Sequence, residues 1–142
     1  MLQQIPRLGP IRVALLIGLL QTPHRFRTKR QLRAYSGLAL ETRTSGEYQF
    51  KEGQLRRSKI APALRGLNVN YNHDLKSLFK GAATQTSTST DPLGEFYQRL
   101  LAKGMRPTMA RLTLARKIAA IVLTIWKKGE RFDPEELKPQ AA

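Results

Sequence analysis

The chain has no cysteine, and this absence excludes disulfides, thiolate metal ligands and cysteine nucleophiles. A sequence without cysteine fits a reducing compartment. Long apolar stretches are absent too. The best candidate covers residues 11–20, contains Arg12 and Gly18, and is too short to span a bilayer, which takes roughly 20 residues. The basic segment QTPHRFRTKR follows it where a signal peptide would have a small-residue cleavage site. We therefore expect neither a membrane partner nor secretion.

Acidic residues are scarce. The sequence has 25 Lys and Arg against 10 Asp and Glu, which gives a formal net charge of +15 at pH 7. The excess is greatest in residues 1–66, with thirteen basic and three acidic groups. A positive field of this size binds polyanions before any specific contact forms. The composition predicts a nucleic-acid partner, and a ribosomal or RNA-packaging role would suit the charge but not the long apolar helix near the carboxy terminus.

The length of 142 residues suits one compact domain. We predict a mainly α fold with a helix-hairpin-helix start, a turn-rich central segment that can hold a short β-hairpin, and long carboxy-terminal helices. We expect residues 1–83 to form the DNA-binding part, which also carries the candidate catalytic serine, residues 84–92 to form a Ser/Thr-rich connection, and residues 93–142 to form the carboxy-terminal helical part of the same domain.

The first twenty residues read as two helices joined by a tight turn at Pro6–Gly9. Such a hairpin presents backbone amides, including those around Gly9, and the amino end of the second helix to a nucleic-acid phosphate. Arg7 and Arg12 would add charge. The usual hairpin has glycine where this chain has Arg7, which makes close backbone approach harder. The alternative is a plain helical hairpin that buries Leu15, Leu16, Leu19 and Leu20.

A cation-rich segment follows. Thr28 is a suitable N-cap for a short helix from Lys29 to Tyr35, with Gly37 beyond its end. The density of positive charge favours phosphate contacts, although such a run is often only a solvated helix face. The candidate DNA-binding residues in this segment are Arg25, Arg27, Lys29 and Arg30.

The segment from Gly37 to Lys59 centres on Thr44-Ser45-Gly46. A small hydroxyl beside a glycine can approach a phosphodiester without steric obstruction. Hydroxyl-glycine pairs are also common in ordinary turns, and this alternative stays open. Glu52-Gly53 is a second turn signal. The candidate DNA-binding residues here are Arg43, Gly46, Lys51, Arg56, Arg57 and Lys59.

Three helices are predicted downstream, over residues 73–83, 93–103 and 106–128. The first begins at His73-Asp74, which is either a general-base pair or a helix cap. The last has a wide apolar band ending near Trp126, and Gly129 stops it. Asp133-Pro134 reads as the capped start of a short final turn.

Together these motifs resemble the carboxy-terminal domain of the one-ten class of insertion-sequence transposases, the recombinases related to the Piv and MooV DNA invertases. The resemblance runs from Ile5 to about Leu137. It rests on the order and spacing of IPRLGP, HRFRTKRQLRAYSGL, TSG, RSK, HDLKSLF and ARLTLARKIAAIVLTIWKKGERFDP.

The resemblance implies an active site of two parts. In that family an amino-terminal RuvC-like domain binds divalent metal, and the carboxy-terminal domain supplies a serine that forms a phosphoserine link with DNA. Ser45 matches that serine, and Thr44 is the competing hydroxyl. The resemblance also implies DNA as substrate, an oligomer when active, and a location in the bacterial or archaeal cytoplasm at the nucleoid. Some members are guided by a bridge RNA, so a guide RNA is a further candidate partner.

This chain departs from the family in one large respect. It begins almost at the hairpin and has no spaced set of Asp and Glu for the RuvC-like metal site. We therefore expect a truncated domain that holds no cofactor, depends on a RuvC-like partner or a full-length transposase for its metal, and binds DNA without breaking it alone. The alternative is a non-catalytic helix-hairpin-helix nucleic-acid-binding module.

Overall fold

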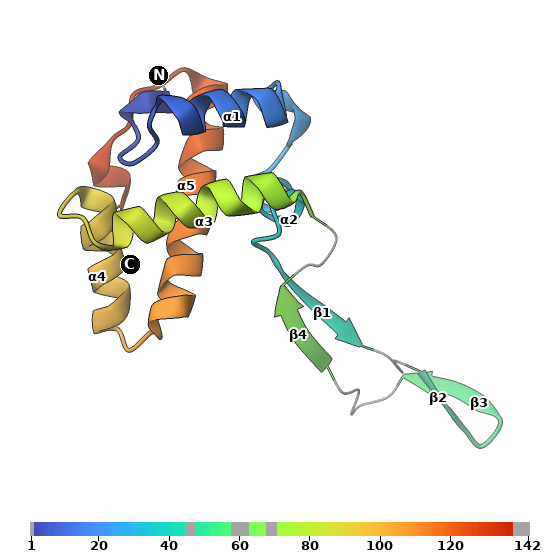
Figure 1. Ribbon diagram of the computed structural model, residues 1–142. Coiled ribbons are helices and arrows are strands. Elements are labelled where there is room, and N and C mark those ends of the chain that lie inside the picture. Colours follow the sequence, from blue (N-terminus) through green and yellow to red (C-terminus); the bar gives the residue numbers. More distant parts are fainter. Residues whose placement is uncertain (1, 45–47, 58–62, 68–70, 138–142) are drawn as a thin grey trace.

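The computed structural model describes residues 2–44, 48–57, 63–67 and 71–137. The fold is mainly helical, as the sequence predicts. Four strands between the second and third α-helices extend away from the helical body (Figure 1). The α-helices are α1 (Pro10–Leu20), α2 (Lys29–Tyr35), α3 (His73–Ser87), α4 (Pro92–Ala102) and α5 (Pro107–Lys128). The 3-10 turns are η1 (Leu2–Gln4), η2 (Pro23–Arg25) and η3 (Pro134–Leu137).

Helix α5 is the centre of the core and packs against α2, α3 and α4. It begins with Pro107 in its first turn, where no amide donor is lost. It ends at Gly129, whose φ of 67° is the left-handed conformation that closes many helices. Fully buried α5 side chains such as Leu114 and Ile118 meet Phe79 and Leu75 of α3 in one cluster. Each such aliphatic side chain contributes about 2 kcal/mol by leaving water.

The amino-terminal hairpin differs from the prediction. Its first element, η1, is a single 3-10 turn rather than a full helix, and α1 follows after the bend at Pro6–Gly9. Leu16 and Leu20 are buried as expected. Leu15 is instead 53% exposed, because a helix of 3.6 residues per turn directs adjacent residues to different sides.

Helix α2 has the predicted bounds. The Thr28 hydroxyl accepts a hydrogen bond from the Gln31 amide, and the Gln31 side chain reaches back to the Thr28 amide, forming a capping box. Gly37, with φ of 69°, follows the end of the helix. Its Cα lies so close to Tyr71 that a Cβ would come within 2.5 Å of the ring. Tyr71 therefore packs directly over the chain where it leaves α2.

The central segment forms two antiparallel strand pairs, which we call the β arm. The strands are β1 (Leu40–Thr44), β2 (Tyr48–Lys51), β3 (Gln54–Arg57) and β4 (Ala63–Leu67). The outer pair joins β1 to β4, with Leu40 opposite Leu67. The inner pair joins β2 to β3 through Glu52-Gly53, both of which have positive φ, as a two-residue type I′ turn requires. The arm is thus a nested hairpin.

Helix α3 continues into the Ser/Thr-rich segment, where we expected a connection over residues 84–92. It runs through Ser87, and Thr86 is fully buried. The hydroxyls of Thr84 and Thr86 donate to the carbonyls four residues earlier, at 2.9 and 2.7 Å. Each hydroxyl is satisfied inside its own helix, so the polar segment can be packed against the core.

Candidate nucleic-acid interface

The hairpin turn before α1 holds its two arginines through internal contacts. Arg7 has φ of 64° and its Nε lies 3.7 Å from a carboxylate oxygen of Asp91. Arg12 donates from Nη1 to the Arg7 carbonyl at 3.0 Å and to Oε1 of Gln85 at 2.7 Å. Arg12 thereby ties the turn to α3. Both guanidinium groups, which the sequence suggested for DNA contact, have protein partners within the domain.

Gly9 occupies the N-cap position of α1 and is exposed. A Cβ built on it would meet nothing within 4 Å. Nothing in the protein therefore crowds Gly9, and the amino end of α1 is open to solvent. Backbone amides at the start of a helix favour an anion, because the helix dipole is positive there. The protein therefore leaves room for the predicted contact between a nucleic-acid phosphate and the backbone at Gly9.

Arg25 links the end of α1 to the aromatic rings of Phe26 and of Tyr35 in α2. Its Nη1 lies 3.4 Å from the Leu19 carbonyl and 3.5 Å from the Leu20 carbonyl at the end of α1. The guanidinium also lies over the rings of Phe26 and Tyr35, at 5.7 and 5.2 Å from their centroids. A cation at a helix carboxy terminus is favourable because the exposed carbonyls there carry partial negative charge.

Tyr35 joins α2 to the start of α3. A hydrogen bond from Asn72, with a further contribution from Arg25, lowers the pKa of the Tyr35 phenol below its usual value. The Asn72 amide also donates to the Tyr35 carbonyl at 2.8 Å. Asn72 caps α3 by accepting from the Leu75 amide at 3.0 Å, so Asn72 has the capping role considered for His73-Asp74. The two ends of the β arm therefore meet at one point on the body.

Arg27, Lys29 and Arg30 are exposed at the start of α2. Arg27 and Lys29 line a hollow of about 350 Å³ together with Lys127 and Lys128 at the end of α5. The Lys127 ammonium donates to the Phe26 carbonyl and lies 3.4 Å from the Arg27 carbonyl. The predicted cations of α2 are thus joined by two from the far end of the sequence.

The remaining predicted cations belong to the β arm. Arg43 pairs with Leu64 across β1 and β4, and Lys51 pairs with Gln54 beside the type I′ turn. Arg56 and Arg57 lie in β3 opposite Gln49 and Tyr48. Ser45, Gly46 and Lys59 lie outside the described residues. Thr44 is the last residue of β1, so Ser45 is the next residue in the chain.

Two further arginines lie at the base of the arm. Arg33 belongs to the cation-rich segment whose charge density predicts phosphate contacts, and Arg116 is an arginine that the sequence did not single out. Nε of Arg33 and Nη2 of Arg116 are buried and have no hydrogen-bond partner in the described part of the chain. Arg116 donates from Nε to the Leu38 carbonyl at 2.5 Å. Burial lowers the pKa of Arg33, and burial together with the charge of Arg33 lowers the pKa of Arg116. The two like charges are therefore close enough to repel.

The sequence gives one sign of the cationic surface that α2 and α5 form together. Residues 1–40 contain no Asp or Glu, and neither does α5. The two helices that meet here thus supply cations without any acid of their own. The signal is visible in the sequence, but the pairing of α2 with α5 becomes visible only in the fold.

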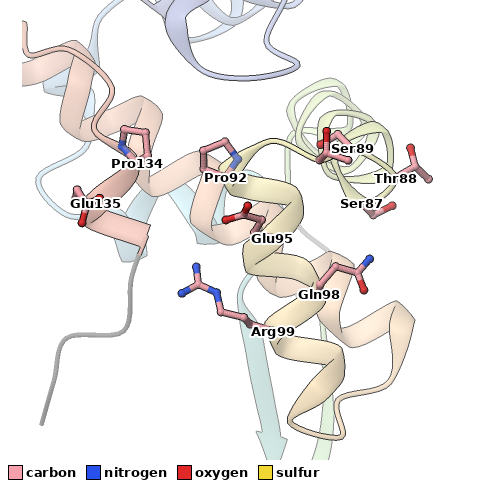
Figure 2. A pocket seen from close by; sticks show the side chains of 10 residues that line it. Ser87, Thr88, Ser89, Pro92, Glu95, Gln98, Arg99, Pro134 and Glu135 are labelled. Carbon is pink, nitrogen blue, oxygen red and sulfur yellow. The ribbon is translucent and has the colours of Figure 1, made fainter.

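A cavity of about 830 Å³ lies elsewhere, between α4, η3 and the end of α3. Figure 2 shows Glu95 and Arg99 of α4 projecting into it, with Glu135 on the η3 side and Ser87 at the end of α3. Two of the charged side chains that line it are carboxylates. Because carboxylates repel a phosphate backbone, this cavity is not part of the cationic surface.

None of the helices that the structure describes has the length and hydropathy to cross a membrane. Within the described ranges, no three His, Asp or Glu side chains gather into a metal-binding group.

The family model described as "Transposase IS116/IS110/IS902 family" matches residues 1–98. The matched region includes α1, α2, the β arm and α3. No curated protein matches the chain.

Proposed function

Because the chain belongs to the IS116/IS110/IS902 family of transposases, we propose that it is the DNA-binding domain that supplies the serine nucleophile for strand cleavage and transfer. The single observation that carries the proposal is the match over residues 1–98, which spans the Thr44-Ser45-Gly46 segment and the cation-rich helices before it. The alternative is a nucleic-acid-binding module without chemistry of its own.

In the proposed step, Oγ of Ser45 attacks a backbone phosphorus of DNA. A serine Oγ–phosphorus bond forms while the bond from phosphorus to one deoxyribose oxygen breaks. The serine proton passes to a base, and the leaving oxygen takes up a proton to become a free hydroxyl. A second strand end then reverses the exchange by attacking the phosphoserine. No oxidant or reductant is needed.

A serine hydroxyl is almost fully protonated near neutral pH and needs a base or a metal ion to activate it. The arm supplies Arg43, Arg56 and Arg57, which can stabilise negative charge on the phosphorane-like transition state but cannot accept the proton. We propose that a RuvC-like domain brings the divalent metal. The chain alone would then bind DNA without cleaving it.

The position of the β arm supports this assignment. Strand β1, whose last residue is Thr44, extends away from the helical body (Figure 1), and Ser45 is the next residue in the sequence. Such a projecting element can reach a duplex without moving the helical body. We further propose that the active form is an oligomer acting at the bacterial or archaeal nucleoid, and that a guide RNA is a candidate partner.

The test is trapping of a covalent protein–DNA species. The chain, combined with a RuvC-like partner domain, divalent metal and DNA carrying the element end, is denatured and analysed for DNA-linked protein. We expect an adduct with wild type and with Thr44→Val, and none with Ser45→Ala. An adduct that persists in Ser45→Ala but disappears in Thr44→Val would make Thr44 the nucleophile. Unchanged DNA binding with no adduct in any variant would favour the non-catalytic module.

A further inference from the structure

A separate hollow of about 450 Å³ lies between α3 and the first turns of α5, two helices that pack together in the core (Figure 1). We call it the α3–α5 hollow. It is lined by Lys80 and Thr84 of α3 and by Thr108, Met109, Arg111 and Leu112 of α5. None of these lining residues is acidic, whereas the cavity beside η3 has two carboxylates. A hollow of this size is large enough for a small ligand or for one unit of a polymer.

The protein itself does not use the two cations of the α3–α5 hollow. Within the described ranges, neither the Lys80 ammonium nor the Arg111 guanidinium has a hydrogen bond or ion pair with another residue. Arg12 and Lys127 differ, because both donate to protein oxygens. Lys80 is exposed and Arg111 is partly exposed, so both side chains can reach a ligand. Two accessible cations from two helices, with no carboxylate in the lining, favour an anion.

The rest of the lining suits an apolar group. Met109 is a large hydrophobic side chain that is 42% exposed, and Leu112 is partly buried against the core. The Thr84 hydroxyl donates to the Lys80 carbonyl at 2.9 Å, so it offers a ligand only an acceptor. An exposed methionine packs well against a flat ring, because its side chain is flexible and its sulfur is polarisable. The α3–α5 hollow therefore combines two cations with an apolar wall.

A nucleotide within a strand has parts that match both features, since it carries a flat base and has a phosphate on each side. In a duplex the base is paired and stacked, whereas an unpaired base can turn out of its strand and lie against protein side chains. Lys80 and Arg111 come from the two helices that border the hollow. Each is therefore placed to bind one of the two flanking phosphates.

Helix α3 also connects the hollow to the β arm. Lys76 lies one turn before Lys80, on the same side of the helix. Its ammonium lies 4.2 Å from the centroid of the Tyr71 ring, at the base of the arm. Asp74, in the first turn, is the only acidic residue of α3. The lysines of α3 thus form a row that leads from the base of the arm to the hollow.

We infer that the α3–α5 hollow accepts one nucleotide of an unpaired strand, with its base against Met109 and its flanking phosphates bound by Lys80 and Arg111. The inference rests on the proposed function in that the partner is a nucleic acid and its strand continues along α3 toward the arm that carries Ser45. It adds a class of substrate, an unpaired strand. It also adds a site whose residues lie outside the set predicted from the sequence to bind DNA.

Binding of oligothymidylate and of a duplex of the same length by the full chain tests the apolar wall. Met109→Ala should weaken single-strand binding roughly fivefold, because the base loses packing surface, and should leave duplex binding unchanged. A strand of the same length without bases should bind to wild type and to Met109→Ala equally. Leu15→Ala is the matched control, because Leu15 is a large hydrophobic residue of α1 that is 53% exposed. Equal weakening of single-strand and duplex binding by Met109→Ala would overturn the unpaired nucleotide.

Lys80→Gln and Arg111→Gln test the flanking phosphates. On oligothymidylate, the slope of log affinity against log salt should become shallower by about 0.7 in each variant, the value of one phosphate contact on a single strand. Lys103→Gln removes the same charge from an exposed position after α4 and should keep the wild-type slope. Repeating the titrations with oligouridylate distinguishes guide RNA from DNA as the source of the nucleotide. The source is the strand whose affinity falls more in Met109→Ala.

The outcomes separate this inference from the proposed function. Unchanged single-strand affinity in Met109→Ala would overturn the inference even if the cation variants bind less, because the hollow would then bind phosphate alone. Unchanged affinity in all three variants, with weaker association to the RuvC-like domain, would show that a protein occupies the hollow and would overturn the inference too. In both cases, loss of the covalent adduct in Ser45→Ala would still support the proposed function. The expected single-strand effects without an adduct in any variant would support the hollow and overturn only the nucleophile.

Discussion

Arg7 shows how one residue can retain a glycine-like conformation. The hairpin turn requires φ of 64° at this position, in the left-handed region that costs a residue with a Cβ about 1 kcal/mol or more. Two contacts within the chain offset this conformational cost. The Arg7 carbonyl accepts a hydrogen bond from Arg12, and the Arg7 side chain, which is 51% exposed, lies near Asp91. An exposed ion pair of this kind contributes little by itself.

We therefore expect Arg7→Gly to be more stable than Arg7→Ala by about 1 kcal/mol. Both variants remove the guanidinium, so their difference isolates the backbone conformation. Chemical denaturation followed by circular dichroism measures the two unfolding free energies. Equal values would mean that the turn relaxes to a negative φ when the side chain is removed.

Some of the residues that shape the site follow from local sequence and others do not. The helix cap at Thr28 and the helix ends at Gly37 and Gly129 depend only on residues nearby in the sequence. They are therefore predictable from local sequence. Arg33 and Arg116 are 83 positions apart in the sequence. Their burial and mutual repulsion arise only when α2 packs on α5, and no local pattern contains that information.

At the scale of elements, the joint between α2 and the β arm is the most constrained. Gly37 has positive φ, and a Cβ there would lie 2.5 Å from Cγ of Tyr71. The Tyr71 ring in turn lies 4.4 Å from the His73 ring and 4.2 Å from the Lys76 ammonium, centroid distances that fix it over the start of α3. A side chain at Gly37 must displace this arrangement.

Gly37→Ala should destabilise the protein by about 2 kcal/mol, through backbone strain and displacement of the Tyr71 ring. Gly104→Ala is the matched control. Gly104 also has positive φ, at 89°, but a Cβ on it would meet nothing within 4 Å. We expect it to cost only about 1 kcal/mol. Thermal and chemical unfolding measure both, and equal costs would mean that Tyr71 moves aside freely.

The elements also show where pattern reading fails. Periodicity located α3, α4 and α5 closely, because their apolar faces repeat at helical spacing. The apolar pattern did not predict that α3 continues through Thr84 and Thr86, because hydroxyl residues are typical of loops. The hydroxyl-to-carbonyl bonds that keep them helical leave no mark in a hydropathy pattern.

The molecule as a whole combines a helical body with an inserted arm. The described strands pair with each other and make few contacts with the helices. The two ends of the insertion are held together by the Asn72–Tyr35 backbone hydrogen bond. The described core cluster around α5 is made of residues from the helices and their connections. The body is therefore expected to fold without the arm.

This can be tested by replacing residues 41–66 with Glu-Gly. Leu40 and Leu67 are direct partners, and Glu-Gly already closes the inner pair as a two-residue turn. The unfolding free energy should change by less than about 1 kcal/mol, because the segment adds little to the core. DNA binding by the cations of the helical body should persist, whereas the covalent adduct should disappear. Loss of cooperative unfolding would show that the body depends on the arm.

The arm joins the body over a short base and extends well beyond it, so its geometry is that of a lever. A small tilt where Tyr71 rests on Gly37 becomes a much larger displacement at the distal bend of Glu52-Gly53. The packing of the Tyr71 ring on Gly37 therefore determines the direction in which the distal end of the arm points.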